Sequence, residues 1–393
     1  MCLSYMATRE EEHSTRGRAN AVVKAPWDPA GAAALGDKRL CEVMDLCLEC
    51  KARVAECPLS VDMATMKLEF LHAYQSQHGV SFRSRLFGRI RALNRVGSFT
   101  EPVSNWPLHS LLFRRLVEQV AGIDRRRPLP RFEREALPRW FAHRPEPTGP
   151  APRGEVLVLA DSFTSYTELE IGRAGIELLE LAGWRVRLEV EGCCRRGAIS
   201  KGLFDDARAG ALDLHERLTP AAAQGIPIVG FEPSCLLALR DEHPSMLRTD
   251  AAETVAGQVR LVEELLLKAL DDGGLTLAPP EGDGLRALFN GHCHQKASVG
   301  MADTVALLER LPGAQVTEVD AGCRGMAGSF ELETEHYEMS LRIGGRRLFP
   351  STSACDPDTV NAATGVSCRQ QIAHGTDRVC QHPLVLFRAA VVS

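Results

Sequence analysis

Thirteen cysteines are the residues of this 393-residue chain with the clearest capacity for chemistry. Cys47 and Cys50 form a C-x-x-C motif, and Cys57 follows with Pro58 directly after it. This spacing fits the iron–sulfur pattern C-x2-C-x2-C-x3-C-P at every cysteine position except the third, where Arg53 stands. A lone C-x-x-C also occurs in zinc half-sites and in redox-active pairs, so both alternatives stay open at this point.

Six further cysteines follow the ends of five predicted β-strands. Cys193 and Cys194 come after residues 184–190, Cys235 after 226–231, Cys293 after 285–289, Cys323 after 315–319 and Cys368 after 360–366. Ligand sites in open α/β sheets form outside the carboxyl ends of the strands, so we expect these thiols at one edge of the sheets, where they suit a cluster or a metal. A cysteine can also be a small buried or surface residue, which is our interpretation of Cys41, Cys355 and Cys380.

The strands that carry these cysteines belong to two successive α/β units. In the first unit, residues 155–160 form a buried-strand run, 169–182 an apolar helix and 258–270 a second helix. After a break at residues 271–274, the same theme restarts and includes a helix over 301–311. We therefore predict a duplicated α/β domain, residues 154–275 and 283–393, with mostly parallel sheets.

The rest of the chain is predicted to be helical. Residues 1–79 hold five of the cysteines and contain apolar helical stretches at 41–48 and 61–74. Residues 80–153 contain no cysteine and combine amphipathic helical patterns with a Pro/Arg-rich stretch, which favours a linker. The predicted fold class is α + α/β, a small helical domain followed by the duplicated domain.

Charge and hydropathy exclude several classes of protein. The 46 Lys and Arg residues against 51 Asp and Glu give a net charge of −5, which does not favour nucleic-acid binding. No apolar run reaches the roughly 18–20 residues of a membrane span, and the N-terminus lacks the features of a signal peptide. We therefore expect a cytoplasmic protein whose thiols stay reduced and serve metal or redox chemistry.

The motifs resemble those of the fused FAD-binding and iron–sulfur-binding dehydrogenases of 2-hydroxy acids such as D-lactate and D-2-hydroxyglutarate. Residues 2–19 are similar to the stretch that leaves the first cluster motif of that family, and residues 47–64 are similar to its second cluster motif. Four further segments resemble its cysteine-rich repeats: Glu232–Cys235, Gly291–Gln295, Gly322–Phe330 and Ser367–Ile372. The glycolate oxidase iron–sulfur subunit and heterodisulfide-reductase-type cysteine-rich domains share this class of repeat.

This resemblance implies a helical ferredoxin-like domain over residues 1–79 and one or more [4Fe–4S] clusters. It implies metal ligation by ten cysteines, namely Cys2, Cys47, Cys50, Cys57, Cys193, Cys194, Cys235, Cys293, Cys323 and Cys368. FAD is expected only on a missing upstream domain or a partner chain. The implied partners are that flavin-binding dehydrogenase domain or subunit and an electron acceptor, a quinone or another carrier. The implied location is the cytoplasm, including a peripheral position at the inner membrane face.

Several features depart from the family pattern. The chain begins at what the resemblance makes the last cysteine of the first cluster motif, so that motif's other three cysteines and the flavin domain are absent. Arg53 replaces a cluster cysteine, Arg195 alters one Cys-Cys-Gly pattern, and Arg324 replaces a thiol of another. On ligand count we expect the repeats to hold iron more firmly than residues 1–79. The alternatives are a non-catalytic α/β binding module or remnant with zinc or no metal, and we expect no dehydrogenase activity from the chain alone.

Overall fold

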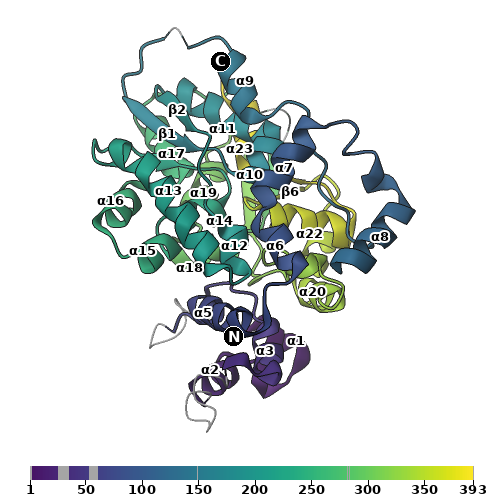
Figure 1. Ribbon diagram of the computed structural model, residues 1–393. Helices are drawn as coiled ribbons and strands as arrows, with labels where there is room; N and C mark the ends of the chain where they lie inside the picture. The colour runs from purple at the N-terminus through teal and green to yellow at the C-terminus, as the bar shows by residue number, and fades with distance from the viewer. Residues whose placement is uncertain are drawn as a thin grey trace.

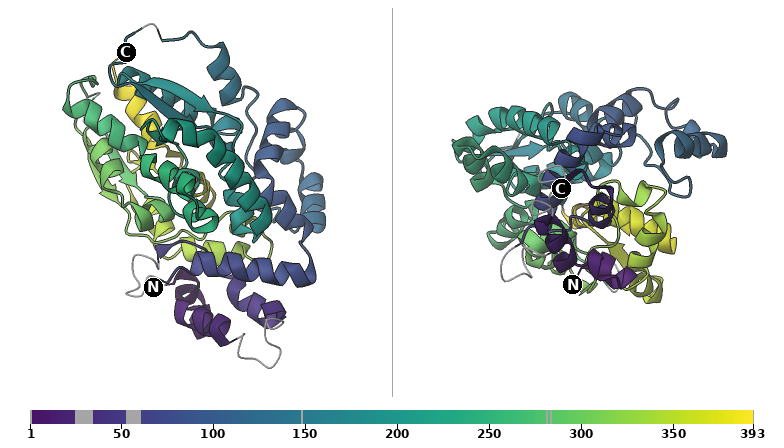
Figure 2. Two further views of the ribbon diagram at one scale, coloured as in Figure 1. Left: turned by 60° about the vertical axis from the view of Figure 1, so that its left-hand side comes forward. Right: turned by 60° about the horizontal axis from the view of Figure 1, so that its bottom comes forward.

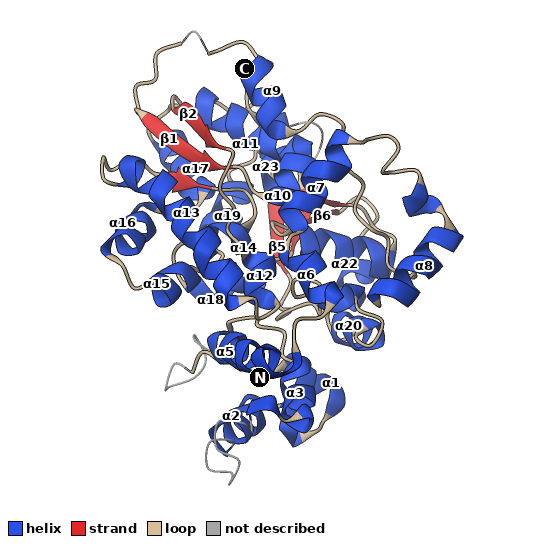
Figure 3. Ribbon diagram, viewed as in Figure 1, coloured by secondary structure: helices blue, strands red, loops and turns tan. Residues whose placement is uncertain are grey.

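The computed structural model describes residues 2–24, 35–52, 61–147, 149–280, 282 and 284–392 (Figure 1). Strands lie in the interior of the larger part of the molecule, with helices around them (Figure 3). The helices of the N-terminal segment form a smaller body below this larger part in the view of Figure 1.

Two β-sheets have the same arrangement of their first three strands. The first sheet has the order β2-β1-β3, and the second has the order β5-β4-β6-β7. Every pairing between these strands is parallel, which confirms the predicted combination of helices with mostly parallel sheets. The strands are β1 (Glu155–Leu159), β2 (Arg185–Glu189), β3 (Ile228–Val229), β4 (Arg286–Phe289), β5 (Gln315–Glu318), β6 (Val360–Ala362) and β7 (Cys380–Gln381).

Helices connect these strands in both α/β units. Those of the first unit are α10 (Ser162–Tyr166), α11 (Leu169–Leu181), α12 (Arg196–Ser200), α13 (Phe204–Ala222), α14 (Pro233–Ala238), α15 (Glu242–Leu247), α16 (Asp250–Gln258) and α17 (Val262–Asp271). Those of the second are α18 (Cys293–Ser298), α19 (Ala302–Glu309), η5 (Phe330–Leu332), α20 (Tyr337–Gly344), α21 (Leu348–Ala354), α22 (Val366–Thr376) and α23 (Pro383–Ala390). None of the helices in the described part of the chain is both long and apolar enough to cross a membrane.

One hydrophobic core extends through both units. Val156 and Val158 of β1 share it with Phe289 of β4 and Ala362 of β6, and all four side chains are fully buried. The continuous apolar sequence of β1 is typical of a parallel strand that is covered on both faces. The last helix, α23, packs against α11 of the first unit. The two units are therefore joined through a common core and not only through the chain between them.

The N-terminal segment consists of α1 (Leu3–Thr8), η1 (Glu11–His13), α2 (Thr15–Lys24), α3 (Lys38–Asp45) and α5 (Met63–His78). Aspartates begin two of these helices because their carboxylates accept from free backbone N–H groups. Asp37 accepts from the backbone N of Leu40 at 2.9 Å, and Asp62 accepts from that of Ala64 at 2.9 Å. Leu40 belongs to a separate small core between α3 and α5, so this segment has hydrophobic packing of its own.

Between the N-terminal segment and the first strand lie α6 (Phe82–Gly88), α7 (Ile90–Phe99), η4 (Pro107–His109), α8 (Leu111–Ala121) and α9 (Leu137–His143). Helix α9 falls within the Pro/Arg-rich stretch. Its Leu137 is fully buried in the main core, where a Cβ added to Gly172 of α11 would lie 2.7 Å from the Leu137 Cδ2 atom. This stretch is thus packed against the first α/β unit.

The helix predicted over residues 258–270 is wrong at its start. Helix α16 ends at Gln258, and α17 begins at Val262. Between them, Val259 forms a parallel bridge with Ile228 of β3, and the backbone N of Arg260 donates to the carbonyl of Ile228 at 2.9 Å. Backbone pairing at the sheet edge therefore interrupts a helical pattern that is continuous in the sequence.

Candidate metal centre

The cysteines of the two α/β units follow the carboxyl ends of their strands. Cys194 and Cys323 lie in the loops after β2 and β5, and Cys235, Cys293 and Cys368 lie in α14, α18 and α22 after β3, β4 and β6. Because the strands of each sheet are parallel, these segments leave the same edge of that sheet. The positions agree with the sequence pattern, whereas metal binding by these thiols stays a prediction.

The thiols of the first unit are in contact with one another. Cys194 donates to the Sγ atom of Cys235 at 2.9 Å, and Cys193 forms a hydrogen bond with Cys194. The bond from Cys194 favours the Cys235 thiolate, but burial and the nearby Asp161 carboxylate outweigh it and raise the pKa of Cys235 to about 11. Without a metal, Cys235 is therefore protonated at neutral pH, and a bound metal ion must displace that proton.

The third position of each Cys-Cys-Gly pattern has a left-handed backbone. Arg195 has a φ of 54°, and Gly325 has a φ of 86° at the corresponding place in the second unit. A left-handed residue with a Cβ costs roughly 1–2 kcal/mol, so Arg195 holds a conformation that favours glycine. At Gly325 a Cβ would lie 2.5 Å from the carbonyl oxygen of Ser340. The two loops therefore share a backbone geometry that their sequences only partly preserve.

In the second unit a buried arginine faces the thiols. The residue Arg324 is 3% exposed, and its Nη2 atom donates to Oδ1 of Asn290 at 2.7 Å. A hydrogen bond with Cys323 stabilises the Cys293 thiolate, burial opposes it, and the charge of Arg324 helps to lower the pKa of Cys293 to about 7. Burial raises the pKa of Cys368, which the Arg324 charge partly counteracts. Arg324 thus adds positive charge where the family pattern has a thiolate.

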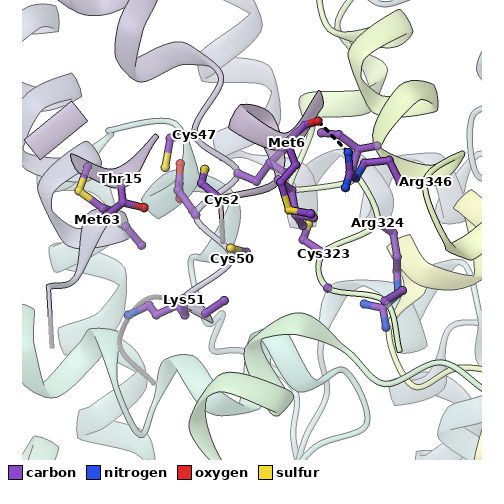
Figure 4. A pocket seen from close by; sticks show the side chains of 18 of the residues that line it. Cys2, Met6, Thr15, Cys47, Cys50, Lys51, Met63, Cys323, Arg324 and Arg346 are labelled. Carbon is purple, nitrogen blue, oxygen red and sulfur yellow. Dashed lines mark hydrogen bonds between the residues drawn. The ribbon is translucent and has the colours of Figure 1, made fainter. Parts of the chain in front are cut away.

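A cavity of about 280 Å³ lies between the N-terminal helices and the second α/β unit (Figure 4). Its walls carry the thiols of Cys2, Cys47 and Cys50 from the N-terminal segment and Cys323 from the loop after β5. This volume is several times the ~30 Å³ of a water molecule, so the cavity has room for a group larger than a single ion. The fold therefore brings four thiols from opposite ends of the chain to one cavity.

One buried cation lines this cavity, and a second contacts the backbone of a cysteine on its wall. Arg18 is 1% exposed, and its Nη1 atom donates to the Sγ atom of Cys2 at 3.1 Å. Burial acts to raise the pKa of Cys2, but the Arg18 charge and hydrogen bonds from Ser4 and the backbone outweigh it and lower the pKa. Lys67, which is buried in α5, donates to the carbonyl of Cys47 at 2.8 Å. These groups provide an environment in which a negatively charged sulfur centre is stabilised.

The loop that holds Cys47 and Cys50 has an unusual backbone. Glu49 and Lys51 both have positive φ angles, 47° and 57°, although neither is glycine. Residues of this kind are held in place by surrounding contacts and cluster at functional sites. Here the His294 Nε2 atom of α18 lies 2.9 Å from the Glu49 carbonyl oxygen. Contacts with the second unit therefore help to fix the direction of the Cys50 thiol.

A further arginine, Arg196, is partly buried and connects all three parts of the chain. The Arg196 guanidinium lies 2.5 Å from a carboxylate oxygen of Glu242, 3.6 Å from one of Glu49 and 3.4 Å from the His294 Nε2 atom. Its charge also acts on the thiols of Cys194 and Cys293. Neither Arg196 nor Arg18 is predicted as a site residue from the sequence. The one sequence feature that could have indicated them is their position, because each lies within a segment that carries a cysteine motif.

One ion pair between α3 and the second unit predicts a pH dependence. The His336 Nε2 atom lies 2.6 Å from Oδ2 of Asp45. Burial disfavours the charged imidazole, but hydrogen bonds to Asp45 and Glu333 outweigh burial and raise the pKa of His336 to about 9. Since this pKa is raised, the stabilisation is complete below about pH 6.5 and lost as the pH rises through 9.

We therefore expect the difference in unfolding free energy between the wild-type protein and His336→Gln to shrink by at most about 3 kcal/mol from pH 6 to pH 9.5. Thermal melting of both proteins across this range measures the difference. If this difference in unfolding free energy does not change with pH, His336 is neutral in the folded protein.

Cys57 and Arg53 lie outside the described residues. Among the residues that are described, no three thiols come within 4.8 Å of one another, and the two groups that satisfy this criterion contain only carboxylates and an imidazole. Thiolates on one tetrahedral zinc ion bind at about 2.3 Å and must be that close. In a [4Fe–4S] cluster each thiolate binds a different iron, so the ligands of one cluster lie farther apart than those of one zinc ion.

Comparison with known proteins gives relatives but no matching family model. The chain is 28% identical to an anaerobic glycerol-3-phosphate dehydrogenase subunit of Escherichia coli K12 over 314 residues, which cover 79% of this chain and 78% of that protein. It is 26% identical to the D-2-hydroxyglutarate dehydrogenase of the same organism, over 87% of this chain and 34% of the enzyme. The enzyme of that name from Pseudomonas putida is 27% identical, over 98% of this chain and 41% of the enzyme.

The chain thus spans most of the length of the first relative but less than half of the two D-2-hydroxyglutarate dehydrogenases. The resemblance that the motifs predict is confirmed: the chain is a homologue of these dehydrogenase proteins and matches the iron–sulfur half of FAD-linked 2-hydroxy-acid dehydrogenases.

Proposed function

We propose that this chain is an iron–sulfur electron-transfer module of a flavin-linked dehydrogenase. Its role is to pass electrons from a reduced flavin on a partner domain or subunit to an acceptor such as a quinone. The observation that carries the proposal is the cavity at which Cys2, Cys47, Cys50 and Cys323 meet beside the buried Arg18. Buried and partly buried thiols, one of which accepts a hydrogen bond from a buried arginine, suit a cluster whose iron and sulfide carry a net negative charge.

The cavity suggests a ligand set for one [4Fe–4S] cluster. Cys2, Cys47 and Cys50 provide three thiolates from the N-terminal segment, which we propose to be ferredoxin-like. The family pattern places the fourth at position 53, where this chain has Arg53. Cys323 lies on the cavity wall, in the same hydrophobic cluster as Cys50, and we assign it as the thiol available to the fourth iron. Iron at this site then depends on both the N-terminal segment and the second unit.

The other thiols are proposed to form a second centre in the repeats. Cys193, Cys194 and Cys235 are already in contact in the first unit. Cys293 and Cys368 lie near the buried Arg324 in the second unit. We keep the assignment of Cys57 as a ligand from the family pattern. The proposed domains are residues 1–79, 154–275 and 283–393, with 80–153 as the connecting helical segment.

The chain's own groups would bind such clusters, orient them and adjust their charge. A bound iron–sulfur cluster supplies one-electron oxidation and reduction without proton transfer at a carbon atom. Arg18 stabilises added negative charge at the N-terminal cavity, and Arg324 does so in the second unit. Burial of Cys47 and Cys323 limits the access of water to their sulfur atoms, whereas Cys2 and Cys50 are partly buried. We propose a cytoplasmic protein that lies peripherally at the inner membrane face.

Metal and sulfide analysis of the anaerobically purified full chain tests the proposal. We expect iron and acid-labile sulfide in about equal amounts, with about four iron atoms for each cluster bound. Zinc without sulfide would instead support a structural metal site. Protein without either metal after reconstitution with iron and sulfide would contradict electron transfer and favour a binding module.

A further inference from the structure

Exposed apolar side chains are concentrated in one segment. Among the described residues, ten of the thirteen large hydrophobic side chains that are exposed lie between Phe82 and Val120. In the left view of Figure 2, the blue helices of this segment lie together along one side of the molecule. Soluble monomers rarely expose contiguous apolar surface of this extent, so the segment indicates a docking surface.

Helix α8 exposes a row of apolar side chains to solvent. Leu112, Leu116 and Val120 follow one another at four-residue intervals and are 75%, 56% and 65% exposed. The partly buried Phe113 and Val117 and the buried Ala121 lie on the opposite side, together with Arg114, which donates to the carbonyl of Arg127 at 2.6 Å. Helix α8 thus carries apolar side chains on both sides, whereas an ordinary surface helix packs its apolar stripe on the core and has a polar outer side. Figure 1 shows α8 at the margin of the molecule, away from both sheets.

Helix α7 and the residues after it continue this exposed surface. Val96 is 62% exposed, Phe99 81% and Trp106 82%. The opposite side of α7 is firmly packed: a Cβ at Gly97 would lie 2.5 Å from the Phe132 ring, and Ser98 donates to the carbonyl of Glu133 at 2.5 Å. Phe99 therefore projects from the end of a helix that is packed against the protein, and Trp106 lies in the turn before η4.

A groove of about 500 Å³ begins beside these residues. Val96 and Phe99 form part of its wall, together with the exposed guanidinium groups of Arg95, Arg134 and Arg139. No ion pair involves these three arginines within the part of the chain that the structure describes. Glu191 is the one acidic residue that lines the groove. A cationic groove next to an apolar surface suits an anionic headgroup with attached acyl chains.

We propose that α7, α8 and this groove form a docking surface for a membrane of anionic phospholipids. The exposed leucine, tryptophan and phenylalanine side chains of this surface would enter the interfacial layer of the membrane. The arginines of the groove, which form no ion pair among the described residues, would bind the phosphate groups of the lipids. This proposal rests on the peripheral membrane location proposed above. It identifies the surface of the protein that would contact the membrane. It also has a functional consequence, because Val190 and Glu191 line the groove two to three positions before Cys193. A quinone dissolved in the bilayer would thereby meet the first α/β unit near its thiols.

Co-sedimentation of the full chain with vesicles tests this surface. We expect binding to vesicles of phosphatidylglycerol and phosphatidylethanolamine that is at least about tenfold stronger than to phosphatidylcholine vesicles, and that weakens as salt is added. The triple variant L112S/L116S/V120S should bind at least about tenfold more weakly. The variant R95E/R139E should lose the preference for anionic lipid.

Val379→Ser is the matched control, since Val379 is 78% exposed but lies outside this segment. It should bind vesicles like the wild-type protein. Circular dichroism should show that all variants are folded, and their bound iron should equal that of the wild type, so that this test is separate from the test of cluster binding. Equal binding by the triple variant and the control would overturn the proposal. A self-association that the triple variant abolishes, without vesicle binding by the wild type, would also overturn it.

Discussion

Cys50→Ser is expected to lower the affinity of the chain for iron by at least about tenfold, because even outer-shell changes around metal ligands cost that much. Cys50 is one of four thiols on the walls of the cavity, and burial raises its pKa to about 12, with the neighbouring Cys293 thiolate as the next cause. Serine keeps the size of the side chain but is a poor ligand for iron in a sulfur cluster. Iron retained after challenge with a ferrous chelator measures the effect.

Cys41→Ser is the matched control, since Cys41 is also partly buried in the N-terminal segment but does not line the cavity. This variant should retain iron like the wild-type protein. Cys323→Ser should also lose iron relative to the wild type, since either variant leaves three of the four thiols on the cavity wall. Equal iron retention by Cys50→Ser and Cys41→Ser would remove Cys50 from the site.

Leu137→Ala is expected to destabilise the protein by about 2–5 kcal/mol. Leu137 is fully buried in the main core and contacts α11, although it lies in a Pro/Arg-rich stretch whose composition is typical of a linker. The loss combines the transfer of apolar surface with a cavity beside Gly172, where backbone of α11 limits relaxation. Thermal melting and denaturant unfolding measure the change.

Leu116→Ala provides the comparison, because Leu116 is 56% exposed and its truncation should change stability by less than about 0.5 kcal/mol. Similar stabilities for the two alanine variants would mean that α9 does not pack on the first unit in solution. A large loss at Leu137 alone would show that residues 80–153 are part of the folded body.

The parallel sheets were predictable because their strands are short, apolar and regularly separated by helices. The run from Val156 to Leu159 can bury both faces, and this property is visible in the sequence. The break at Val259 was not predictable, since it depends on pairing with Ile228, which is distant in the sequence. The packing of α9 was not predictable for a similar reason. Proline and arginine content indicates the local backbone conformation, but it does not indicate the tertiary contacts that bury Leu137.

For the candidate site, the sequence predicted which thiols follow strands but not which of them meet. The spacing of Cys47 and Cys50 is a local signal, whereas the approach of Cys323 to their cavity results from packing of the N-terminal segment on the second unit. Arg18 and Arg196 were missed because arginine is common in solvated helices, and the full burial of Arg18 and the partial burial of Arg196 depend on partners far along the chain. Tertiary contacts therefore decide the charge around the thiols, and with it the chemistry that they support.

Reversible reduction of the full chain tests its proposed role as an electron carrier most directly. The protein should be purified without oxygen, reduced with dithionite, and examined by electron paramagnetic resonance and visible absorption before and after addition of a soluble quinone. We predict a paramagnetic iron–sulfur signal and bleaching of the visible band on reduction, both reversed by the quinone. Protein that holds zinc or no metal, with no signal on reduction and no change with quinone, would contradict the assignment.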